Sequence, residues 1–129
     1  MSHSAVTRGV TSEADAVAIH SQLERLFASP FFKNSKRCVT FLDYVTEGAL
    51  RGESQKLKER TLGIDVFERK PDYDTNLDPV VRTTANEVRK RLAQYYNESG
   101  HEAEIRIDLP AGSYIPEFRV PENGTTTAT

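Results

Sequence analysis

The stretch from Asp78 to Glu98, DPVVRTTANEVRKRLAQYYNE, decides the fold that this sequence predicts. Aspartate followed by proline favours a helix start, because Asp caps free N–H groups and proline at the first helical position needs no donor. Apolar residues then recur at intervals of four and three, namely Val81, Ala85, Val88, Leu92 and Tyr95. This spacing puts them on one face of a helix. We predict a helix over 79–98, roughly 30 Å long, with Gly100 as its stop.

The opposite face of this helix carries hydrogen-bond donors. At about 100° per residue, Thr83, Asn86 and Lys90 point away from the apolar stripe, and Arg82 and Arg89 flank them. Arginine pairs with guanine edges, asparagine with adenine edges, and lysine with phosphates. We therefore predict that these five residues face DNA. The competing interpretation is an ordinary solvated face, which is common in helices that bind nothing.

A change of period after Gly100 predicts a β-hairpin. In EIRIDL, residues 104–109, apolar and charged side chains alternate, as in a half-buried strand. Pro-Ala-Gly-Ser at 110–113 provides a turn, and apolar residues alternate again up to Phe118. Proline at 116 lacks a donor, so the return strand is expected at an edge of the sheet. The predicted hairpin spans residues 104–118.

Three shorter helices are predicted ahead of the long one. Apolar spacing places them at 13–28, at 36–50 and within 55–67. Ser12 and Ser35 precede the first two as N-caps.

The predicted fold class is therefore α+β and mostly helical. It is a winged helix-turn-helix-like arrangement with N-terminal helices and a C-terminal β-hairpin wing. A length of 129 residues fits one domain. We place that domain at 13–119, between a flexible N-terminus at 1–12 and a flexible tail or linker at 120–129.

Composition restricts the class of protein. No apolar run approaches the roughly 20 residues of a membrane span, and no signal peptide precedes the first helix, so we expect a cytoplasmic protein with no membrane segment. Cys38 is the sole cysteine, which excludes an internal disulfide, and its place on an apolar helix face predicts a buried thiol. Catalytic motifs are absent from the sequence. We predict no enzymatic activity and no cofactor.

The acidic connection before the long helix resembles half of a calcium-binding loop. Asp72, Asp74, Asn76 and Asp78 stand at alternate positions, but Leu77 replaces the glycine that such a loop needs in its middle. The final glutamate is missing as well. We interpret these residues as a helix cap and turn residues, and predict no metal site.

Positive charge is concentrated in two parts of the chain, although the net charge is −2. Residues 31–60 carry 7 basic and 4 acidic groups, and residues 79–100 carry 4 and 2. The first part includes Lys33, Lys36 and Arg37, at the start of the second helix. There the side chains and the free N–H groups of the helix could bind phosphates together.

Three motifs follow one another along the chain: LKERTLGIDVF at 57–67, DPVVRTTANEVRKRL at 78–92, and Gly112-Ser113-Tyr114. Over residues 57–118 the chain thereby resembles the winged-helix effector domains of OmpR-type and CadC-type regulators. The resemblance implies that the long helix enters the major groove and that the hairpin with Arg106 acts as the wing. It also implies that loop 65–78 contacts a protein partner or another copy of the chain, and the competing interpretation is a simple solvated loop. That family begins with a small sheet, whereas this chain begins with helices. We therefore expect the hairpin to lack its usual partner strands.

Segments 19–45 and 57–74 are also similar to an N-terminal module of bacterial signalling or regulatory proteins. The leading hypothesis is thus a bacterial DNA-binding transcriptional regulator, or the DNA-binding module of a regulatory protein, with double-stranded DNA as its partner. The alternative is a protein-protein interaction or regulatory module that keeps the winged-helix shape without binding DNA. Its support is the net charge of −2 and the acidic hairpin.

Overall fold

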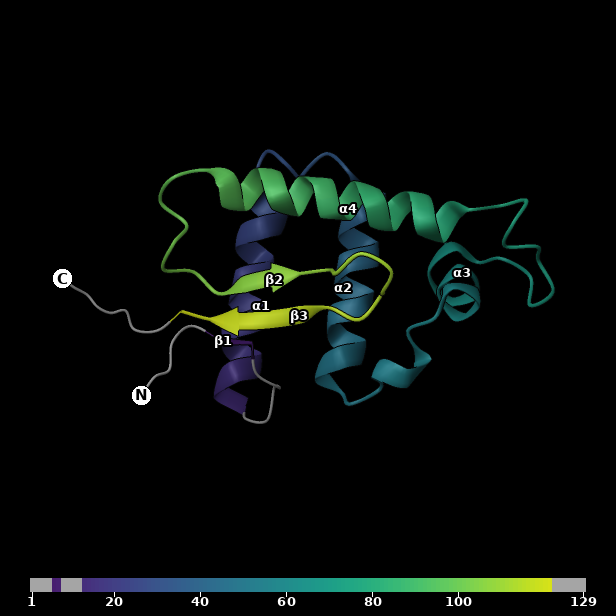
Figure 1. The fold of residues 1–129 in the computed structure, drawn as a ribbon, viewed down its shortest axis with the longest axis horizontal. Coiled ribbons are helices and arrows are strands. Elements are labelled where there is room, and N and C mark those ends of the chain that lie inside the picture. The colour runs from purple at the N-terminus through teal and green to yellow at the C-terminus, as the bar shows by residue number, and fades with distance from the viewer. Residues whose placement is uncertain (1–5, 8–12, 122–129) are drawn as a thin grey trace.

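Helices make up most of the structure, a computed structural model that describes residues 6–7 and 13–121. Within these residues the fold is α+β, with four α-helices, one short 3-10 turn and three strands (Figure 1). In chain order they are β1 (Val6–Thr7), α1 (Glu13–Ala28), α2 (Lys36–Leu50), η1 (Ser54–Lys56), α3 (Glu59–Phe67), α4 (Val80–Asn97), β2 (Arg106–Asp108) and β3 (Glu117–Val120).

The first two helices have the predicted bounds. The Ser35 hydroxyl accepts a hydrogen bond from the Cys38 backbone N–H at 3.3 Å, so Ser35 is the N-cap of α2 as predicted. Ser12, the predicted cap of α1, lies outside the described residues. The third helix, predicted within 55–67, is α3 at Glu59–Phe67, and the short turn η1 precedes it.

The long helix α4 begins at Val80, one residue later than predicted. The Asp78 carboxylate nevertheless accepts a hydrogen bond from the Val80 backbone N–H, and it also accepts one from Arg69. The Arg69 hydrogen bond is the larger cause that lowers the pKa of Asp78 below its ordinary value. Pro79 is the N-cap residue of α4, so the prediction of Asp78 as the N-cap is wrong by one residue. Asp78 instead accepts the first N–H of the helix and at the same time fixes the preceding loop.

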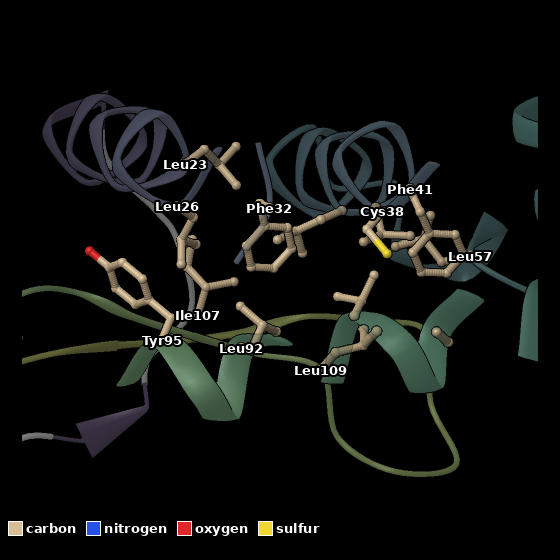
Figure 2. Packing of buried hydrophobic residues seen from close by; sticks show 14 of the residues in the cluster. Leu23, Leu26, Phe32, Cys38, Phe41, Leu57, Leu92, Tyr95, Ile107 and Leu109 are labelled. Carbon is tan, nitrogen blue, oxygen red and sulfur yellow. The ribbon is translucent and has the colours of Figure 1, made fainter. Parts of the chain in front are cut away.

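The elements form two layers. Helices α1 and α2 make one layer, and α4 runs across them beside the hairpin in the other (Figure 1). Side chains from both layers point toward one another in the space between them (Figure 2). Phe32, Phe41, Cys38, Val88 and Ile107 are each fully buried there, which confirms Cys38 as a buried thiol. Each layer thus buries the apolar face of the other, as a two-layer domain requires.

The strands form an antiparallel sheet in the order β1-β3-β2. The return strand begins at Glu117, so the prediction that it starts directly after the turn at 110–113 is wrong. Pro116 is buried just before the strand and has no N–H to donate to a ladder. Ile107 is opposite Phe118, and both side chains face the core.

The return strand β3 is the middle strand of this sheet, so the expectation that it lies at an edge is wrong. The hairpin also pairs with β1, although we expected it to lack its usual partner strands. Val6 pairs with Val120, and Thr7 pairs with Arg119. These two residues lie in the segment 1–12 that the sequence predicts to be flexible. A strand of two residues is too short to show alternation, and its pairing uses backbone groups. No sequence pattern therefore predicts it. In the described part of the chain, no helix is long and apolar enough to cross a membrane.

Candidate nucleic-acid interface

The buried and exposed faces of α4 are divided as the helical wheel predicts. The five residues of the apolar stripe are at most 4% exposed. Thr83, Asn86 and Lys90 are exposed on the far side. Gln94 and Asn97 are exposed at the next positions along the same stripe. The sequence pattern could have identified these two residues, because they continue the spacing of three and four residues toward the end of the helix.

The outward face of α4 has no uncompensated acidic side chain. Glu87 is the acidic residue of this helix, and its carboxylate lies 2.9 Å from the Arg91 guanidinium one turn later. Arg91 also donates a hydrogen bond to the Phe31 carbonyl. This contact puts the turn between α1 and α2 beside the middle of α4. The exposed stripe therefore presents neutral amides, a hydroxyl and a lysine, which suit hydrogen bonding to a polar or anionic surface.

Arg82 is used inside the protein. Its guanidinium lies 3.3 Å from a carboxylate oxygen of Glu59 on α3 and donates a 2.9 Å hydrogen bond to the Thr75 carbonyl. The helical wheel gives the direction of this side chain but not the presence of α3 and the loop beside it. Arg82 thus positions the connection between α3 and α4, with part of its side chain still exposed.

Arg89 is also bonded within the protein, to the turn of the hairpin. Its guanidinium donates to three backbone carbonyls, those of Leu109 at 3.0 Å, Pro110 at 3.2 Å and Ser113 at 2.8 Å. It also donates to the Asn86 amide oxygen at 2.6 Å. One side chain of α4 therefore holds the turn between β2 and β3 against the helix. The turn is not a free arm that extends away from α4.

Arg106, the predicted basic residue of the wing, also has partners within the fold. Its guanidinium lies over the Tyr96 ring, 4.8 Å from the centroid, and contacts Asp108 at 3.1 Å. Asp108 also contacts Arg119 at 3.3 Å. A groove of about 360 Å³ lies between α4 and the hairpin, and its charged lining residues are Arg89, Arg106, Arg119, Asp108 and Glu117. The two carboxylates lower the positive charge of this groove.

Three exposed cations lie at the start of α2. Lys33 is in the turn before the helix, and Lys36 and Arg37 are in its first turn. The hydrogen bond from Arg91 to Phe31 brings this turn next to α4. The structure therefore places these three predicted residues in and just after the turn that contacts Arg91 of α4.

The loop that follows α3 is fixed by three arginines. Arg60 donates to the carbonyls of Pro71 and Tyr73, while Arg69 and Arg82 hold its later part. The Tyr73 ring also packs directly over Gly63, where a side chain would collide with it. The loop that the resemblance assigns to a protein partner is therefore a structured surface.

The carboxylates of this loop form a turn, as predicted. Asp74 accepts hydrogen bonds from the backbone N–H groups of Asn76, at 2.8 Å, and Leu77. Asp78 is engaged with Arg69. No group of three or more metal-ligating side chains occurs in the residues that the structure describes.

Comparisons with models of protein families, with curated proteins and with solved structures find no match to this chain. The fold and the distribution of side chains on α4 are therefore the basis for any assignment of function.

Proposed function

We propose that this chain is a DNA-binding module of a regulatory protein, and that the exposed face of α4 reads double-stranded DNA. The observation that carries the proposal is the stripe along this face, which has five hydrogen-bonding side chains and no uncompensated acid. They are Thr83, Asn86, Lys90, Gln94 and Asn97. Amide side chains can pair with the edge of adenine, and lysine with guanine or phosphate. A helix with such a face fits the width of the major groove.

The order of elements supports a winged-helix arrangement. Helix α3, a connection, helix α4 and an antiparallel hairpin follow one another, and β1 adds a third strand next to β3. In winged-helix proteins the hairpin lies beside the recognition helix, and here β2 packs against α4. The hairpin reaches DNA on this proposal only near Ala111 and Gly112, which are exposed at the tip of the turn.

The proposal gives the predicted residues outside this stripe two further roles. Lys33, Lys36 and Arg37 contact phosphates at the edge of the α4 face. Arg82 and Arg89 position the loop and the hairpin turn, because their donors are already bonded within the protein. Arg106 shares this positioning role through Tyr96 and Asp108.

Fluorescence anisotropy with a labelled mixed-sequence duplex tests this function. Between about 50 and 200 mM salt, we expect binding to weaken steeply, because phosphate contacts release counterions. Lys90→Ala removes one such contact and lowers the slope of log affinity against log salt by about 1. Lys56→Ala is the matched control, since Lys56 is an exposed lysine on η1, outside the proposed face.

Two results would contradict the proposal. One is the absence of binding at the lowest salt concentration. The other is an equal loss of affinity in the Lys90 and Lys56 variants, which would show attraction by overall charge and not by the α4 face.

A second candidate function is protein binding through loop 65–78. Leu77 favours it, because this side chain is 84% exposed on a loop that three arginines fix in place. An exposed leucine beside Asp72 and Asp74 suits an apolar pocket with a basic rim on a partner. Sedimentation velocity of the wild type and of Leu77→Asp over a range of concentrations tests the case in which that partner is a second copy. Self-association that is lost in the variant would support it, and a monomer at every concentration would exclude that case.

A further inference from the structure

A histidine lies between two carboxylates just beyond the end of α4. The Nδ1 atom of His101 is 2.7 Å from a carboxylate oxygen of Glu104, and its Nε2 atom is 3.1 Å from one of Glu98. The ring stacks on Tyr95 with 3.9 Å between centroids and 14° between planes. The His101 side chain is 20% exposed. We call Glu98, His101, Glu104, Tyr95 and Gln22 the His101 cluster.

This geometry requires a particular protonation state. A neutral imidazole has one N–H donor and one lone pair, so it can donate to one carboxylate only. At the other ring nitrogen, the lone pair would face the second carboxylate and repel its oxygen. Both contacts are favourable only when His101 is an imidazolium with two donors. Accordingly, the hydrogen bonds to Glu104 and then to Glu98 raise the pKa of His101 above its ordinary value.

Glu104 connects this histidine to the helical layer. One of its oxygens accepts a 2.6 Å hydrogen bond from the Tyr95 hydroxyl and a 2.8 Å hydrogen bond from the Gln22 amide on α1. Gln22 is 3% exposed. The charge of Glu104 is thus held where water has little access, and the imidazolium of His101 compensates it.

The cluster also adjoins the start of the hairpin. The Gln22 amide donates to the Tyr96 hydroxyl at 3.3 Å. That hydroxyl accepts from the Ile107 backbone N–H at 3.0 Å and donates to the Ile105 carbonyl at 2.9 Å. The segment from the end of α4 to β2 is therefore fastened to α1 through polar contacts that meet at Gln22 and Glu104.

Other charged groups near the cluster come from each neighbouring element. Glu102, in the same segment, accepts a hydrogen bond from the Gly100 N–H. Arg25 of α1 is exposed and lines a hollow of about 550 Å³ beside Glu104. On β2, Arg106 pairs with Asp108 and covers the Tyr96 ring. The charged groups in direct contact with the imidazole are Glu98 and Glu104, and the uncharged Tyr95 ring stacks on it.

We propose that His101 makes the attachment of the hairpin to α1 and α4 sensitive to protons. The imidazolium joins Glu98 to Glu104, and loss of its proton leaves one of these contacts. Glu98 is the residue released, because its side chain is 53% exposed and can be hydrated, whereas that of Glu104 is 14% exposed. The segment 98–105 then loosens, and with it the attachment of β2.

The pH window follows from the two opposite shifts. The pKa of His101 is raised from 6.5, so its stabilisation is complete below about 6.5 and is lost as the pH rises through the folded-state pKa. Burial tends to raise the pKa of Glu104, but hydrogen bonds from Tyr95, Gln22 and His101 outweigh it and lower the pKa from 4.5. That stabilisation is complete above about 4.5 and is lost as the pH falls through the folded-state pKa. Both contributions are therefore complete between about 4.5 and 6.5.

An NMR titration of the histidine ring protons tests the proposal in the wild type. We expect His101 to titrate above 6.5 and Glu98→Gln to lower its pKa, because that variant removes one negative partner on the surface. Hydrogen exchange reports the attachment of β2. We expect the Ile107 amide, corrected for the intrinsic rate, to lose protection as His101 loses its proton.

Thermal melts across the same pH range complete the test. The melting temperature of the wild type should fall as His101 deprotonates, and this fall should disappear in His101→Gln. His20→Gln is the matched control, since His20 contacts Glu47 between α1 and α2 and lies outside the cluster. It should retain the fall.

A pKa of His101 at or below 6.5, or unchanged protection of Ile107 across the titration, would overturn the proposal. Both readouts use the wild type, so they decide the matter even if His101→Gln does not fold. The outcome is separate from DNA binding, because none of these measurements contains a nucleic acid.

Discussion

Arg89→Ala removes one guanidinium from α4 and with it the three hydrogen bonds that hold the hairpin turn. The carbonyls of Leu109, Pro110 and Ser113 lose their charged donor together. We expect this substitution to lower the free energy of unfolding markedly. Lys90→Ala, at the adjacent exposed position, should leave it almost unchanged.

The magnitude follows from the number and setting of these bonds. A hydrogen bond to a charged group contributes about 1.5–3 kcal/mol net. Three bonds at the lower value would give about 4–5 kcal/mol if all acceptors stayed dry. The turn is partly buried, and its carbonyls can regain water, so we expect about 2–4 kcal/mol for Arg89→Ala. For Lys90→Ala, an exposed position, we expect less than about 0.5 kcal/mol.

Urea denaturation followed by circular dichroism measures both variants. Arg89→Lys is an informative third variant, because it keeps the charge but replaces the guanidinium with one ammonium that cannot reach three carbonyls in a plane. It should recover only part of the loss. Equal unfolding free energies for Arg89→Ala and Lys90→Ala would refute the positioning role of Arg89.

This difference also decides how DNA binding is tested. A loss of affinity in an Arg89 variant could come either from a missing phosphate contact or from a displaced hairpin. Lys90 separates the two effects, because it is exposed and carries none of the hydrogen bonds that fix the turn.

Three further outcomes are expected. Gly63→Ala should destabilise the protein by about 1–2 kcal/mol in urea denaturation, because the new Cβ would collide with the Tyr73 hydroxyl group and the gain in helix propensity offsets only part of the clash. No loss of stability would show that Tyr73 moves aside freely. Ser35→Ala should cost about 0.5–2 kcal/mol in the same assay, since it removes the N-cap of α2. The pKa of Tyr44 is raised to about 12, chiefly by its hydrogen bond to Asp65, so Asp65→Asn should lower it in an absorbance titration, and an unchanged value would contradict this cause.

The sequence by itself determined the helical elements and the face that each one buries. The spacing of Val81, Val88 and Leu92 predicted the buried side of α4, and the same spacing identified Thr83 and Lys90 as exposed. This succeeds because burial on a helix depends on a period of 3.6 residues, which is a local property of the chain.

Only the tertiary structure decided what the arginines do and how the strands pair. Arg89 reaches carbonyls 20 to 24 residues away, and Gln22 and Glu104 meet across 82 residues. Such contacts have no period, because they depend on how the helical layer and the hairpin pack together. The same holds for β1, whose two residues pair through backbone groups that every residue possesses. The sequence pattern therefore predicts that an arginine such as Arg89 faces DNA. Its role in holding the hairpin becomes visible only from its contacts with distant residues.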